Sequence, residues 1–179
     1  TLQTWMQSKV DTNTAANTVV VMTDGHACPD TVCATNDANA LVRKYVNAGG
    51  RIIWPSTPCV YYQGHKNTGT YTTWASGGCL NIFGVSIVND LGSDTPTITA
   101  EGAKWGIIEM GGAGWTDIAP STVTSVLAQN PAGNGKAAFK NFNSTYPNSG
   151  LVLYSDFLDG NDPEQRISVY NLATYPYSY

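Results

Sequence analysis

Side chains suited to nucleophilic or acid–base chemistry follow two apolar runs in the sequence, residues 19–22 and 51–54. A serine or cysteine attacks an acyl carbon when a histidine removes its proton and a carboxylate orients that histidine. The residues that could fill these roles are Asp24, His26, Ser56, Cys59 and His65. One hypothesis is therefore a hydrolase in which Ser56 or Cys59 is the nucleophile and acts with His65 and Asp24.

A structural role explains the same residues without any reaction. No glycine-flanked nucleophile turn or oxyanion-hole motif accompanies them, so no residue is assigned as catalytic from a motif. Asp24 can cap a loop, Ser56 can bond backbone groups in a proline-rich turn, and His65 can be a solvated loop residue. We favour this structural interpretation of the sequence.

Aromatic residues are concentrated between positions 56 and 78, the longest segment without helical or strand periodicity. A loop of this length in a compact domain is functional or tied down, and its aromatic rings often pack it onto its own domain. Apolar rings with polar rims can instead stack on sugars. The candidate ligand-binding residues are Tyr61, Tyr62, His65, Tyr71 and Trp74.

The chain has four cysteines, Cys28, Cys33, Cys59 and Cys79. An even number on a chain of low charge predicts two disulfides in an oxidising compartment. Three pairings are open, of which Cys28–Cys33 with Cys59–Cys79 is the simplest, because each bond would fix a loop beyond a strand. The Cys-x4-Cys spacing suits zinc poorly, so we expect no metal. Since no phosphate-binding glycine motif is present either, we expect no cofactor.

Composition narrows the class of partner. Charged residues make up only 12% of the 179 residues, and the formal net charge is −4. The scattered Lys and Arg residues form no basic stripe that could follow a phosphate backbone, so nucleic acid is not expected. No apolar run approaches the length of a membrane span. The low charge, and the glycosylation acceptor sequence that begins at Asn143, favour a secreted glycoprotein.

Secondary-structure signals agree best between residues 18 and 56. Residues 19–22 are a β-branched apolar run that predicts a strand buried on both faces. Apolar residues at positions 38, 41, 42, 45 and 46 predict an amphipathic helix that Gly49 and Gly50 terminate. Residues 51–54 predict a second strand. In this order the elements form a βαβ unit with parallel strands.

The same patterns assign the rest of the chain. Helices are predicted near residues 2–10, 79–85, 120–129, 136–142 and 163–175, the last with Asp162 as N-cap. A third strand is predicted at 150–155, an extended piece at 86–88, and a hairpin-like or irregular segment at 95–115. The chain is then a single α/β domain, residues 1–179. A helix before the first strand indicates either that a preceding strand was removed by processing or that the sheet begins one strand short.

Two segments resemble a known superfamily. Residues 40–54 read as a helix, a double glycine and a strand, and residues 150–165 as a strand, a loop and a helix. Both are similar to the class I glutamine amidotransferase-like superfamily, in particular its trehalose-utilisation-protein-like (ThuA-like) branch. The resemblance covers about a fifth of the chain. It implies a flavodoxin-like fold, a three-layer α/β/α sandwich with a mostly parallel sheet.

The catalytic residues of that superfamily have no counterpart in this sequence. Its amidotransferases place a cysteine in a Gly-x-Cys-x-Gly turn directly after the strand. Here residues 55–58 read Pro-Ser-Thr-Pro, without either glycine, and Cys59 comes three residues late. The His-x-Glu pair of the superfamily is replaced by Ser-Asp-Phe at 155–157. The resemblance therefore implies the scaffold without its catalytic triad.

Together these observations favour a secreted, non-catalytic binding or structural module on a glutamine amidotransferase-like scaffold, with a protein or a glycan as partner. Two alternatives stay open. One is the secreted hydrolase that uses Ser56 or Cys59. The other is a carbohydrate-binding domain that uses the aromatic segment from Ser56 to Gly78.

Overall fold

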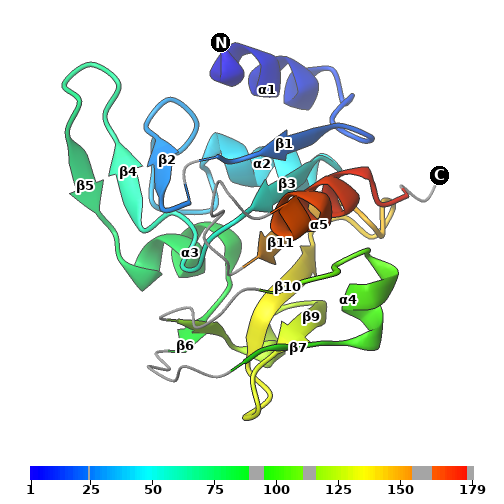
Figure 1. The fold of residues 1–179 in the computed structure, drawn as a ribbon. Helices are drawn as coiled ribbons and strands as arrows, with labels where there is room; N and C mark the ends of the chain where they lie inside the picture. Colours follow the sequence, from blue (N-terminus) through cyan, green and yellow to red (C-terminus); the bar gives the residue numbers. More distant parts are fainter. Residues whose placement is uncertain (24, 89–94, 111–115, 155–162, 177–179) are drawn as a thin grey trace.

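The computed structural model describes residues 1–23, 25–88, 95–110, 116–154 and 163–176. Figure 1 shows a mixed α/β chain. The helices are α1 (Leu2–Asp11), α2 (Leu41–Asn47), α3 (Ser76–Phe83), α4 (Ala100–Lys104) and α5 (Pro163–Thr174). The strands are β1 (Val19–Val21), β2 (Ala27–Pro29), β3 (Arg51–Trp54), β4 (Tyr62–Gly64), β5 (Tyr71–Thr73), β6 (Ile87–Val88), β7 (Thr97–Ile98), β8 (Asp117–Ile118), β9 (Ser125–Gln129), β10 (Gly135–Asn141) and β11 (Gly150–Tyr154).

The predicted βαβ unit is present. β1 and β3 are parallel, with Val20 opposite Ile52, and α2 lies between them in the chain. After α2 the chain turns at Gly49, whose φ of 93° is a left-handed conformation that costs glycine little. β1 lies at the edge of the sheet, and its Val19 and Val21 side chains are each 36% exposed. The predicted burial of this strand on both faces is therefore wrong: Val20, on one face, is only 9% exposed, whereas the face that carries Val19 and Val21 is partly open to solvent.

The main sheet is mixed rather than mostly parallel. β11 lies parallel to β3, which confirms the third predicted strand. Beyond β11 the pairings are antiparallel: β10 with β11, β9 and β8, then β8 with β6 and β9 with β7. The strand order is β1-β3-β11-β10-β8-β6, and β9 and β7 branch from β10. The mostly parallel sheet implied by the resemblance is thus limited to β1, β3 and β11.

Two segments predicted as helices are strands. β9 and β10 form an antiparallel hairpin over residues where helices were expected, and only Pro120–Thr122 is helical, as a single 3-10 turn. Because β10 pairs with strands on both sides, long-range pairing outweighs the helical spacing of Val123, Val126 and Leu127. The segment 95–115 was predicted to be hairpin-like or irregular; its described residues, 95–110, contain the short strand β7 and the helix α4 rather than a hairpin.

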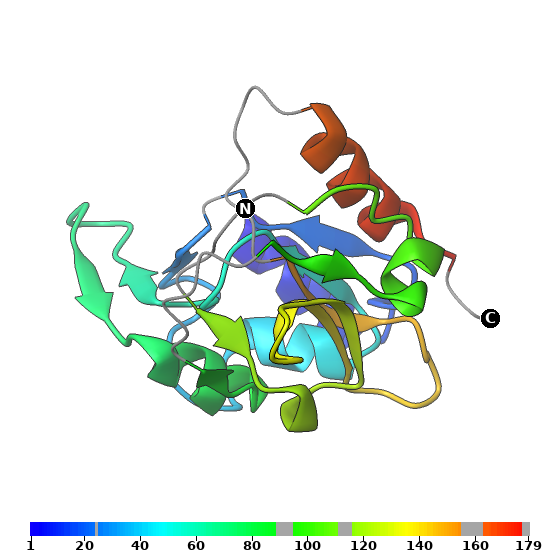
Figure 2. The same cartoon turned by 60° about the horizontal axis from the view of Figure 1, so that its bottom comes forward.

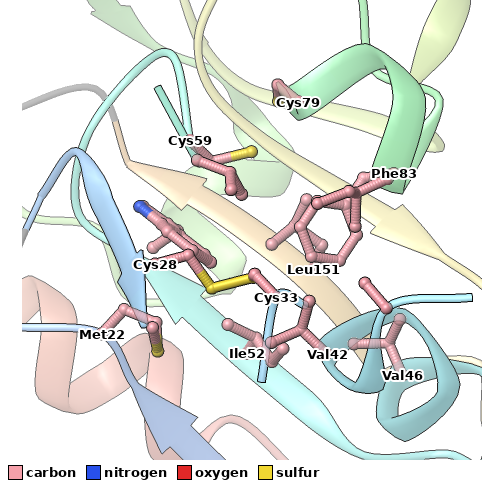
Figure 3. Packing of buried hydrophobic residues seen from close by; sticks show 14 of the residues in the cluster. Met22, Cys28, Cys33, Val42, Val46, Ile52, Cys59, Cys79, Phe83 and Leu151 are labelled. Carbon is pink, nitrogen blue, oxygen red and sulfur yellow. A yellow bond between two sulfur atoms is a disulfide. The ribbon is translucent and has the colours of Figure 1, made fainter. Parts of the chain in front are cut away.

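Helices cover both faces of the parallel strands. Ile52 of β3 belongs to an apolar cluster that includes Val42 of α2 and Phe83 of α3, and Figure 3 shows these side chains together. The next residue, Ile53, belongs to a second cluster on the opposite face, with Leu172 of α5. This alternation follows from the period of two in a strand. It places the core on both sides of β3.

A second, smaller sheet consists of β2, β4 and β5. β2 and β4 are parallel, and β4 and β5 form an antiparallel hairpin. Figures 1 and 2 both show this hairpin projecting away from the main sheet. The His65 N–H donates to the Thr70 carbonyl over 2.8 Å and closes the hairpin turn. The segment predicted to lack regular structure therefore contains two strands and the beginning of α3.

Candidate functional site

Ser56 and His26 meet where β3 and β1 end. Ser56 Oγ lies 3.1 Å from His26 Nε2, within hydrogen-bond distance. Because β1 and β3 are parallel neighbours, the residues that follow them lie at the same edge of the sheet. Gly25 permits the approach, since a Cβ at this position would lie only 2.8 Å from the Ser56 Cβ. The Trp54 indole N–H donates to the Gly25 carbonyl over 2.8 Å and fixes the turn.

Both candidate nucleophiles are buried. Ser56 is 2% exposed and Cys59 is fully buried. Burial, together with the neighbouring Cys79 thiol, raises the pKa of the Cys59 thiol well above its ordinary value. A thiol that keeps its proton is a poor nucleophile. In this structure, therefore, neither residue is presented to a substrate.

His65, the predicted base, contacts other residues. Its Nε2 lies 2.8 Å from Thr72 Oγ1, and its Nδ1 lies 3.6 Å from the Asp30 carboxylate. Asp24, the predicted third member, lies outside the described residues. Among the described residues, Ser56 thus has His26 as its histidine partner, and His65 is paired with Asp30.

Three tyrosines form a row that leads from His26 to the β4–β5 hairpin. The ring centroids of His26 and Tyr61 are 6.3 Å apart, those of Tyr61 and Tyr62 4.6 Å, and those of Tyr62 and Tyr71 4.8 Å. We call Tyr61, Tyr62 and Tyr71 the tyrosine row. Tyr71 is 67% exposed. Trp74, in contrast, packs against the main apolar cluster, so this predicted ligand-binding residue contributes to the core.

An open, mostly apolar groove of about 520 Å³ lies along the small sheet. Its lining includes Leu2 of α1, Val21 of β1, Pro29 of β2 and Gly64 of β4. Gly64 is opposite Tyr71 in the β4–β5 ladder. Residues opposite each other on neighbouring strands share one face of a sheet. The groove and the exposed end of the tyrosine row therefore lie on the same face.

Polar side chains surround a second open hollow, of about 480 Å³. Its lining includes Asp30, Gln63, His65 and Lys66. Asp30 Oδ2 accepts a hydrogen bond from the Lys66 backbone N–H over 3.3 Å, and Gln63 Nε2 donates to the Cys33 carbonyl over 2.7 Å. A carboxylate, an imidazole and an ammonium group can hydrogen-bond to a hydroxylated ligand. The sequence carries no signal for this cluster, because the small sheet that assembles it was not predicted.

One of the two predicted disulfides is present. Cys28 and Cys33 are bonded, and Figure 3 shows their sulfur atoms within the apolar cluster. Cys59 and Cys79 are buried free thiols, and their side chains hydrogen-bond to each other. The predicted Cys59–Cys79 disulfide is therefore not formed in this structure. Fully buried thiols behave as small apolar side chains, and both residues contribute to the core in this way.

The glycosylation acceptor, Asn143, lies in the loop between β10 and β11. Its side-chain Nδ2 donates to the Asn47 carbonyl over 2.9 Å, and its Oδ1 accepts from the Thr145 N–H over 3.0 Å. The side chain thus holds this loop against the end of α2. A structural role accounts for the residue independently of any glycan.

The described residues contain neither a cluster of metal-ligating side chains nor a helix that could span a membrane. No group of three or more metal-ligating side chains is found among them. None of the helices they form is both long enough and apolar enough to cross a bilayer.

Comparison with protein-family models, curated proteins and solved structures finds no match to this chain. The glutamine amidotransferase-like resemblance therefore rests on the two sequence segments alone.

Proposed function

We propose that this protein is a secreted, non-catalytic binding module that holds a glycan along the tyrosine row. The observation that carries the proposal is a contrast in exposure. Tyr71 is 67% exposed on the projecting hairpin, whereas Ser56 is 2% exposed and Cys59 is fully buried. An exposed aromatic ring stabilises the fold little, and it offers a face to a ligand.

The chemistry of the small sheet suits a sugar. The rings of the tyrosine row meet edge to face, at 68° and 65°. Sugars combine apolar C–H faces with hydroxyl rims, which match such rings. The groove on the same face of the small sheet is also lined by His65, Lys66 and Thr70, whose polar groups can hydrogen-bond to the hydroxyl groups of a sugar. With only 12% charged residues in the chain, a neutral ligand fits better than a charged polymer.

We also propose that the fold is flavodoxin-like, as in glutamine amidotransferase-like proteins, and that the protein is secreted. α2 and α5 on opposite faces of β3 support a flavodoxin-like, three-layer arrangement for the parallel part of the sheet, as in glutamine amidotransferase-like proteins. Helices on both faces are typical of parallel sheets. The Cys28–Cys33 disulfide and the low charge support secretion. A glycan on Asn143 would have to be attached to Nδ2 before this atom bonds to the Asn47 carbonyl.

A glycan array that compares the wild type with two variants tests the ligand class. Tyr71→Ala removes the exposed end of the row. Tyr170→Ala is the matched control, because Tyr170 is also 67% exposed but lies on α5. We expect wild type and Tyr170→Ala to bind the same glycans, and Tyr71→Ala to bind them about tenfold more weakly, the loss of one stacking contact. Equal weakening in both variants, or no binding by the wild type, would refute the proposal.

A serine hydrolase is the second candidate, favoured by the 3.1 Å contact between Ser56 Oγ and His26 Nε2. A fluorophosphonate probe, which labels activated serines, distinguishes the two functions. A hydrolase would be labelled at Ser56, would lose the label in His26→Ala and would keep it in His65→Ala. We expect no labelling, because Ser56 is buried.

A further inference from the structure

Lys136, Asp117 and Asn130 form a buried polar cluster that has no part in the site described above. Lys136 is 2% exposed, Asp117 0% and Asn130 2%. Lys136 Nζ is in contact with Asp117 Oδ1, and Asn130 Nδ2 donates to Asp117 Oδ2 over 2.6 Å. The two oxygens of one carboxylate therefore face two different groups, an amine and an amide.

The backbone holds the lysine opposite the aspartate. Ile118 of β8 pairs with Gly135 of β10, and the two strands are antiparallel. The residue after Gly135 then lies across from the residue before Ile118, which places Lys136 opposite Asp117. Asn130 is fixed by the β9–β10 turn, where its Oδ1 accepts from the Asn134 N–H over 2.9 Å.

We propose that Lys136 and Asp117 are joined by an amide bond, an intramolecular cross-link between β10 and β8. A proton passes from the Lys136 ammonium to the Asp117 carboxylate within the contact and leaves a neutral amine beside a carboxylic acid. Nζ attacks Asp117 Cγ and a C–N bond forms. Oδ1 takes up the proton that the nitrogen releases and leaves as water.

Asn130 has a positioning role in this reaction. Negative charge develops on Oδ2 while Cγ is tetrahedral, and the Asn130 amide already donates to that oxygen. Such a preorganised donor stabilises the intermediate. Atoms balance with the release of one water, and no oxidant, reductant or cofactor takes part.

Burial favours the product over the ion pair. Two charges held away from water carry a desolvation cost that their attraction offsets only in part. A neutral amide removes both charges from the interior and keeps an acceptor oxygen for the Asn130 N–H. The fixed geometry also replaces an encounter in solution with reaction between groups already in contact.

Tryptic mapping tests the cross-link directly. Trypsin cleaves after unmodified lysine and arginine; after Lys104 the next such residues are Lys136 and Lys140. The wild-type chain, denatured, reduced and alkylated, is expected to yield residues 105–140 as one peptide that is lighter than its sequence by one water. Fragmentation should place the link between positions 117 and 136. An unmodified chain would give residues 105–136 at full mass.

Two controls separate the cross-link from other losses of mass. Lys136→Arg keeps the positive charge but cannot form this amide, so trypsin should cleave at position 136 and the peptide should have full mass. A cyclic imide at aspartate also loses water, but mild base hydrolyses an imide and leaves the amide intact. The proposal is overturned by a full-mass wild-type peptide, by a water loss that persists in Lys136→Arg, or by loss of ammonia with the link on Asn130.

Discussion

Arg51 carries a charge and yet is completely buried at the start of β3. Its Nε and Nη2 donate to the Asn148 carbonyl over 3.0 and 2.6 Å. Its Nη1 donates to the Leu172 and Tyr175 carbonyls over 3.0 and 2.9 Å. The guanidinium also lies over the Trp105 ring, 5.3 Å from its centroid. One side chain thus ties the end of α5 to β3 and to the loop before β11.

Arg51→Met should lower the free energy of unfolding by about 3–5 kcal/mol, because it leaves several buried carbonyls without their charged donor. Arg51→Lys should recover little of this loss, since an ammonium cannot reproduce the forked geometry. Urea unfolding measures both. Arg166→Met, at an exposed position of α5, is the control, and its effect should stay within about 0.5 kcal/mol. An Arg51→Met chain as stable as that control would contradict this role.

Cys59 gives the fold a dependence on pH at the alkaline end. Burial raises the pKa of its thiol in the folded state. In the unfolded chain the thiol has its ordinary pKa of about 8.5, so above that pH the unfolded state loses a proton that the folded state keeps. Stability is therefore full below about pH 8.5 and falls as pH rises from there towards the folded pKa. Urea midpoints measured across this window should decline, and Cys59→Ala should remove part of the decline. An unchanged slope in Cys59→Ala would argue against it.

For single residues, the sequence indicated which side chains are candidates for chemistry, but it did not indicate which residues they contact. Ser56, His26 and His65 were all recognised as candidates, but the pairing of Ser56 with His26 depends on Gly25, whose missing side chain lets two strand ends approach. Arg51 was assigned only to a strand. Nothing in its local sequence indicates that its guanidinium donates to the distant carbonyls of Asn148, Leu172 and Tyr175.

Among the elements, α3 is positioned by a close backbone contact. A Cβ at Gly78 would lie 2.0 Å from the carbonyl oxygen of Val60, a residue with a φ of 53°. Gly77, one residue earlier on the same helix, has free space, since its Cβ would meet only Asn81 Nδ2 at 3.8 Å. The two glycines therefore form a matched pair within one turn.

Gly78→Ala should destabilise the protein by about 1–3 kcal/mol, because the methyl group must displace backbone. Gly77→Ala should be neutral or should stabilise by up to about 1 kcal/mol, since alanine favours a helix over glycine. Thermal unfolding of the two variants side by side checks this. If both variants changed stability by the same amount, α3 would not be docked through Gly78.

Elements that depend on local signals were predicted correctly, and those that depend on distant pairing were not. Residues 19–54 contain an amphipathic stripe, a glycine stop and two apolar runs, and they form the parallel βαβ unit. β9 and β10 have helical spacing but are held as strands by each other and by β11. β4 and β5 have no apolar alternation, because β5 is exposed on both faces. A period-based reading cannot detect such a strand.

At the scale of the whole molecule, the proposed binding surface and most of the apolar core lie on different sheets. Most members of both apolar clusters lie on the main sheet and the helices that cover it, and Cys28 of β2 joins the small sheet to the first cluster. The small sheet projects from it, as Figure 2 shows, and carries the exposed end of the tyrosine row. A rigid body that supports an exposed aromatic hairpin suits binding, because substitutions on the hairpin can change the ligand without disturbing the core.

The most direct test of glycan binding by the tyrosine row is a titration followed by the NMR signals of the tyrosine rings. Soluble hexasaccharides of glucose and of N-acetylglucosamine, each in its α- and β-linked forms, are added in turn to the wild-type protein. We predict that at least one of them shifts the ring signals of Tyr62 and Tyr71 and leaves those of Tyr170 in place. Ring signals that stay unchanged with every sugar, or that move equally at Tyr170, would contradict the account.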